Sequence, residues 1–98
     1  MKRRISVRPE AQIEIKETAV WYESRLRGLG TRFRDELRAT LSHIAENPLR
    51  FPSIGQDIRR ALLHRFPYAL YFIVKSDVVI IVAVLSQRRR SVSWQDRR

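Results

Sequence analysis

The sequence has 98 residues, enough for one folded domain but too few for two independent cores. It carries 20 lysines and arginines against 10 aspartates and glutamates, and its hydrophobic fraction of 44% argues against wholesale disorder. The lack of cysteine excludes disulfides and thiolate metal sites, and the two histidines have no partner at ligand spacing, so we expect no metal site. No cofactor is expected either. The net charge of +10 favours an anionic partner such as RNA, DNA or an acidic protein, with simple solubilising charge as the alternative.

The N-terminal residues are charged and are followed by no apolar core, so they do not form a secretion signal. The longest apolar run, residues 78–85, is too short to be a membrane-spanning helix. We therefore expect a soluble, cytoplasmic protein with no membrane partner. It should form one domain over residues 1–98, with a basic tail over about residues 87–98.

The first half of the chain has a helical pattern. A short strand is expected over residues 3–7, and Pro9 suits the first turn of a helix. Two helical stripes of apolar residues are separated by Gly28 and Gly30, which permit a sharp reversal of the chain. The stripes consist of Ala11, Ile15, Ala19 and Tyr22, and of Phe33, Leu37, Leu41 and Ile44. They predict two antiparallel helices with one shared apolar side, the second ending at Asn47-Pro48.

The second half has the pattern of strands, after a loop expected over residues 48–57. Residues 58–65, 68–75 and 78–86 are rich in β-branched and aromatic side chains, and Ser76-Asp77 can turn the last two runs into a hairpin. Residues 78–85 are all apolar, which predicts a central strand buried on both faces. The predicted fold is α+β in the order β-α-α-β-β-β, with a helical hairpin packed on a small, mostly antiparallel sheet.

Four arginines near the ends of the predicted strands are candidates to bind an anion. Arg59 and Arg60 open the first strand after the loop, and Arg88 and Arg89 follow the last strand. Arginine pairs bidentately with phosphate or carboxylate groups. Side chains alternate along a strand, so only one of Arg59 and Arg60 is expected to join Arg89 in a common site. The alternative is separate solvated arginines that deter edge-to-edge pairing.

Catalysis would need more than these arginines. Cleavage of RNA through its 2′-hydroxyl requires an acid, a base and cations that stabilise the developing phosphorane. Arg59 and Arg89 can supply the cations, and His64 is the candidate for proton transfer, with a structural role as its alternative. No acid–base pair is evident, so the sequence leaves open whether the protein is an enzyme. Trp94 is expected to anchor the tail to the sheet rather than to stack on a base.

The order of several short motifs resembles that of the RelE/ParE toxin superfamily, over about residues 5–94. The motifs are Trp21-Tyr22-Glu23, Gly28-Leu29-Gly30, Asn47-Pro48, Phe51-Pro52, Ile58-Arg59-Arg60, Arg65-Phe66-Pro67-Tyr68 and Ala83-Val84-Leu85 leading into Arg88-Arg89. The Phe66-Pro67-Tyr68 segment is more similar to the ParE, or plasmid-stabilisation, branch. Many relatives of this type carry histidine where this chain has Ser86, and serine cannot act as a general acid near neutral pH.

The resemblance implies the toxin of a type II toxin–antitoxin system. A ParE-like toxin would arrest growth by inhibiting DNA gyrase without catalysis. The alternatives are an RelE-like endoribonuclease that cleaves mRNA on the ribosome through Arg59, Arg89 and His64, and a non-toxic interaction module. The resemblance further implies a heteromeric complex with a cognate acidic antitoxin, bound as an amphipathic helix or an added strand.

The excess apolar surface of the first predicted helix is the candidate receiving site for that antitoxin. It consists of Val20, Trp21 and Leu26. The alternative is that these side chains simply pack on the sheet.

Overall fold

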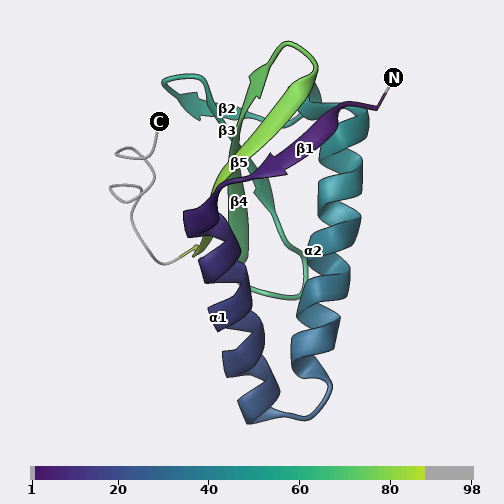
Figure 1. Ribbon diagram of the computed structural model, residues 1–98, viewed down its shortest axis with the longest axis vertical. Helices are drawn as coiled ribbons and strands as arrows, with labels where there is room; N and C mark the ends of the chain where they lie inside the picture. The colour runs from purple at the N-terminus through teal and green to yellow at the C-terminus, as the bar shows by residue number, and fades with distance from the viewer. Residues whose placement is uncertain (1, 88–98) are drawn as a thin grey trace.

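Two helices lie side by side against one face of a five-stranded sheet (Figure 1). The computed structural model describes residues 2–87. Its elements are β1 (Arg4–Val7), α1 (Pro9–Arg25), α2 (Leu29–Glu46), the 3₁₀ helix η1 (Pro48–Arg50), β2 (Ser53–Gly55), β3 (Ile58–Leu62), β4 (Tyr68–Lys75) and β5 (Val78–Ser86). This order confirms the predicted α+β fold, and the β4–β5 hairpin has the predicted bounds.

The sheet has the strand order β1-β5-β4-β3-β2. β1 runs parallel to β5, with Arg4 opposite Val78, and the other neighbours are antiparallel. The prediction of a mostly antiparallel sheet is therefore confirmed. β5 lies between β1 and β4 and is largely buried on both faces, which is the environment expected for its unbroken apolar run.

One strand was not predicted. The segment from Pro48 to Asp57, expected to be a loop, contains η1 and the three-residue strand β2. Ser53 pairs with Arg59 of β3, and the chain returns through three consecutive residues with positive φ. Those residues are Gly55 (116°), Gln56 (54°) and Asp57 (65°). Two consecutive residues with positive φ produce a reversal tight enough for a short hairpin. A segment with the composition of a loop therefore contains a strand.

β3 ends earlier than predicted, at Leu62 rather than at residue 65. The backbone N–H groups of His64 and Arg65 donate to the carboxylate of Glu36 on α2. A side chain distant in sequence thus satisfies these donors, and the chain leaves the sheet. Local propensity did not reveal this partner.

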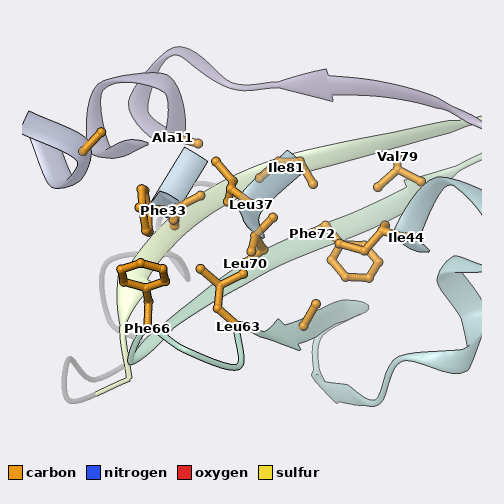
Figure 2. Packing of buried hydrophobic residues seen from close by; sticks show 13 residues of the cluster. Ala11, Phe33, Leu37, Ile44, Leu63, Phe66, Leu70, Phe72, Val79 and Ile81 are labelled. Carbon is orange, nitrogen blue, oxygen red and sulfur yellow. The ribbon is translucent and has the colours of Figure 1, made fainter. Parts of the chain in front are cut away.

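The main core fills the space between the helices and the sheet (Figure 2). Phe33 of α2 is completely buried, and its ring lies 5.4 Å from that of Phe66 in the β3–β4 loop. β4 contributes Leu70 and Phe72 to the same core. Each large apolar side chain buried in this way stabilises the fold by about 1.5–3 kcal/mol. The apolar stripes predicted for the two helices therefore meet the sheet on one shared side.

The two glycines of the helical hairpin have different roles. Gly28 has a φ of 89° and makes the reversal before α2, as predicted. Gly30 lies inside α2, where a Cβ atom would sit 2.5 Å from the carbonyl oxygen of Ala19. Its missing side chain therefore lets α1 and α2 approach each other. The carboxylate of Glu23 on α1 also accepts hydrogen bonds from the backbone N–H groups of Gly28 (2.8 Å) and Gly30 (3.0 Å). N–H groups at the start of a helix have no acceptor within the helix itself.

A second apolar cluster occupies the opposite face of the sheet. Residues alternate along β4, so Leu70 and Phe72 face the helices while Tyr71 and Ile73 face away. Tyr71 and Ile73 join a cluster with residues of β3 and β5, including Ile58.

Among residues 2–87, no helix has the length and apolar character needed to cross a membrane.

Candidate functional site

Arg59 is held by backbone groups. Its Nη1 atom donates to the carbonyl oxygen of Phe51 at 2.6 Å and lies 3.4 Å from that of Leu49. Arg59 also pairs with Phe72 in the β3–β4 register, on the side of the sheet that faces the helices. A charged donor bound to carbonyl groups stabilises the turn that contains them. The geometry therefore gives Arg59 a structural contact in addition to its predicted role.

Arg60 lies on the other face, as the alternation predicted. It stands opposite Tyr71, which is only 5% exposed. The Nε atom of Arg60 is buried and has no hydrogen-bond partner among the residues that the structure describes. A buried donor without an acceptor is unfavourable, and a ligand oxygen would relieve that cost. Of the two predicted arginines on β3, Arg60 is thus the one whose buried Nε lacks an acceptor.

His64 does not lie near the start of β3. It is exposed in the β3–β4 loop, beyond the end of the strand, whereas Arg59 is the second residue of that strand. Five residues of extended chain span about 16 Å. His64 instead borders a groove of about 640 Å³ between α2 and this loop, together with Arg32 and Phe66. The structure therefore does not bring His64 and Arg59 together.

Arg88 and Arg89 lie outside the described residues, as does Trp94. The predicted grouping of Arg89 with a β3 arginine therefore stays a prediction. Ser86 is the last residue of β5 and pairs with Tyr68, so the basic run begins close to the end of this central strand.

The outer face of α1, by which we mean Ile13, Lys16, Glu17, Val20 and Trp21, carries large apolar side chains. Ile13 is 57% exposed, Val20 58% and Trp21 50%. With Ser24, these residues line a groove of about 610 Å³. Val20 and Trp21 are therefore not buried against the sheet, although Trp21 also borders Val84 and Leu85 of β5.

The end of the helical hairpin extends this apolar surface. Leu26, just after α1, is 57% exposed. The guanidinium of Arg25 lies 4.7 Å from the centre of the Trp21 ring, close enough for a cation–π interaction. The predicted antitoxin-binding residues Val20, Trp21 and Leu26 are thus all exposed in the free chain.

The edge of the sheet formed by β1 and the end of β5 offers little room for an added strand. On the edge of β1 that faces away from β5, the N–H of Arg3 donates to the carbonyl of Ala45 (2.8 Å), and Gln12 donates to the carbonyl of Val7 (2.9 Å). β1 accompanies β5 only as far as Ile81. These contacts occupy backbone groups that a new strand would need.

Glu14 continues the protection of β5 beyond the end of β1. One oxygen of its carboxylate accepts the N–H of Val84 at 2.9 Å. Sequence reasoning missed Glu14, as it missed Glu36 and Glu23. Each acts on a backbone N–H group outside its own helix, and residue spacing carries no signal for such contacts.

The fold has known counterparts. A solved structure of the chromosomal ParDE toxin–antitoxin system from P. aeruginosa aligns with a TM-score of 0.76 at 13% sequence identity, covering 87% of this chain and 96% of that one. A double arginine-to-alanine mutant of the E. coli toxin RelE in its free state aligns with a TM-score of 0.73 at 19% identity, covering 99% and 94%. Both identities are low, so these similarities establish the fold alone.

Comparison with curated proteins finds no match. A family model, by contrast, matches residues 5–91, which is most of the chain. Its description is the ParE toxin of the type II toxin–antitoxin system parDE. The protein therefore belongs to the ParE toxin family of type II toxin–antitoxin systems, within the RelE/ParE superfamily.

Proposed function

We propose that this toxin arrests growth by inhibiting DNA gyrase, and that a cognate antitoxin neutralises it by direct binding in the cytoplasm. The observation that carries the target is the match of the ParE family model to residues 5–91. The geometry is consistent with a toxin that binds rather than cleaves. His64 lies beyond the end of β3, apart from Arg59, and it is the histidine that an RelE-like mechanism would use for proton transfer.

The antitoxin would cover the outer face of α1 as an amphipathic helix. Both modes remained open from the sequence, and the occupied backbone groups of β1 and β5 favour a helix over an added strand. α1 itself carries four glutamates against one lysine and one arginine. An acidic antitoxin would therefore bind α1 through apolar contacts with Ile13, Val20 and Trp21. Its negative charge would be attracted to basic residues in other parts of the toxin.

The target is tested with the purified toxin in two assays. We expect it to inhibit supercoiling by gyrase while mRNA on programmed ribosomes stays intact. Cleavage of mRNA in the ribosomal A site with normal supercoiling would overturn the proposal in favour of the RelE-like alternative. Expression without growth arrest would instead leave a non-toxic interaction module.

The neighbouring arginines of β3 provide a matched pair for the target surface. Arg60→Ala should weaken gyrase inhibition at least about tenfold while leaving stability nearly unchanged, because its Nε has no described partner to lose. Arg59→Ala should lower the free energy of unfolding by about 1.5–3 kcal/mol, since a charged donor leaves the Phe51 carbonyl. We expect Arg89→Ala to abolish growth arrest. Full inhibition by the Arg60 variant would remove this residue from the target surface.

The antitoxin surface is tested by isothermal titration with the cognate antitoxin. Val20→Asp should weaken binding about 100-fold or more, because a charge enters the apolar centre of the contact. Leu49→Asp is the matched control, since Leu49 is 56% exposed on η1, away from α1. Equal loss of affinity in both variants would show that the outer face of α1 is not the receiving site.

A further inference from the structure

The outer face of α1 is complementary to itself. Ile13, Glu17, Val20 and Ser24 follow one another at spacings of four, three and four residues, which places them along one line of the helix. All four are exposed, and Lys16 flanks the line at its middle. A stripe with this spacing suits an antiparallel pair of helices.

A two-fold axis between Lys16 and Glu17 makes the match explicit. In an antiparallel pair, residues whose numbers are equally distant from the axis lie opposite each other. Ile13 then faces Val20 of a second copy, and Lys16 faces Glu17 of that copy. The two-fold repeats each contact, so the arrangement contains two apolar pairs and two ion pairs and leaves no like charges directly opposed at the centre.

Overall charge also directs self-association to this helix. Two chains of net charge +10 repel each other over most of their surfaces. The outer face of α1 is the exception, because the charged residues that line its groove, Lys16 and Glu17, have opposite charges that cancel. Two copies therefore approach with the least repulsion along α1, where the exposed Ile13 and Val20 lose contact with water.

We propose that, in the absence of antitoxin, two copies of this toxin associate through antiparallel α1 helices. A 17-residue helix is about 25 Å long, so the contact is small and the dimer should be weak, with a dissociation constant on the order of micromolar. The proposed antitoxin helix occupies the same face, so its binding and dimerisation exclude each other. The dimer itself does not depend on gyrase as the target.

A charge exchange across the proposed axis tests the arrangement. The full chain is studied by sedimentation velocity from low to high micromolar concentration. We expect a monomer–dimer equilibrium that Lys16→Glu and Glu17→Lys each weaken at least about tenfold, since each change turns two attractive pairs into two repulsive ones. The double variant Lys16→Glu/Glu17→Lys restores opposite charges and should recover most of the affinity. Circular dichroism checks that the variants stay folded, which the exposure of both residues favours.

Three outcomes would overturn the proposal. The first is a monomer over the whole concentration range. If antitoxin binding still depended on Val20 in that case, the outer face of α1 would bind the antitoxin but not a second copy of the toxin. The proposed function would then stand without the dimer. The second is a dimer unaffected by either single change, which would place the interface elsewhere. The third is a double variant as weak as the singles, which would exclude this antiparallel register.

Discussion

The two helices distribute their apolar residues differently. α2 is conventional, because its large side chains Phe33 and Leu37 are buried. α1 fully buries only small apolar residues, Ala11 and Ala19; Ile15 and Tyr22 are half-buried against the core, and Val20 is exposed. A helix whose role is only to complete a core is expected to show the pattern of α2.

The difference supports the proposal that one helix of the hairpin mainly serves the fold while the other also offers a binding surface. Small inward residues on α1, together with Gly30 on α2, allow the two helices to pack closely. The large residues on the outer face of α1 contribute little to this packing, because about half or more of each apolar side chain stays exposed. Large exposed apolar side chains gathered on one helix are typical of surfaces that bind other proteins, which supports the proposed docking surface on α1.

The largest expected effect on stability comes from replacing one aromatic residue of α2 by alanine, compared with the same replacement on α1. Phe33→Ala should lower the free energy of unfolding by about 3–5 kcal/mol, because it empties the centre of the core. Trp21→Ala should lower it by only about 1–2 kcal/mol, since half of the side chain is already exposed and the rest packs on Tyr22. Urea denaturation measures both. A large loss of stability in the Trp21 variant would mean that the outer face of α1 serves the fold after all.

The closeness of the helices can be tested at Gly30. Gly30→Ala should cost about 1–3 kcal/mol, because the new Cβ would meet the carbonyl oxygen of Ala19. Gly28→Asn is the control: its φ is positive, Asn tolerates that conformation, and no atom lies within 4 Å of a Cβ there. We expect amide chemical shifts around Ala19 to move only in the Gly30 variant. Equal effects of both changes would refute the close approach as the reason for Gly30.

The smallest effect is on stability at high pH. Burial, and secondarily the neighbouring Tyr68, raise the pKa of Tyr22 above its ordinary value of 10.0. Below pH 10 the folded and unfolded states both keep the phenol protonated, so Tyr22 adds no pH dependence. As the pH rises above that value, the unfolded chain ionises first and stability falls. Tyr22→Phe should make this fall in the free energy of unfolding less steep above pH 10.0, and an unchanged slope would contradict the assignment.

Local pattern predicted most of the fold. The β4–β5 hairpin had the right bounds because β-branched runs and the Ser76-Asp77 turn are signals within a few residues. β2 was missed because it has only three residues, follows Pro52 and ends at Gly55, a composition typical of a loop. The early end of β3 was missed because Glu36, 28 residues away from His64, supplies the partner.

The candidate site was only partly predictable. Alternation correctly separated Arg59 from Arg60, and the excess apolar surface correctly singled out Val20 and Trp21 as surface residues. The sequence did not indicate which arginine would be engaged. That depended on the carbonyl of Phe51, which the η1 turn brings next to Arg59.

The sequence by itself determined the order of elements, the single apolar side of the helical hairpin and the excess of positive charge, because periodicity and composition act over short distances along the chain. Only the tertiary structure decided which polar groups are occupied. The carboxylates of Glu14, Glu23 and Glu36 each bind backbone N–H groups beyond their own helix, and Arg59 binds carbonyls across a turn. Such bonds depend on where the chain returns in space, so residue spacing could not reveal them.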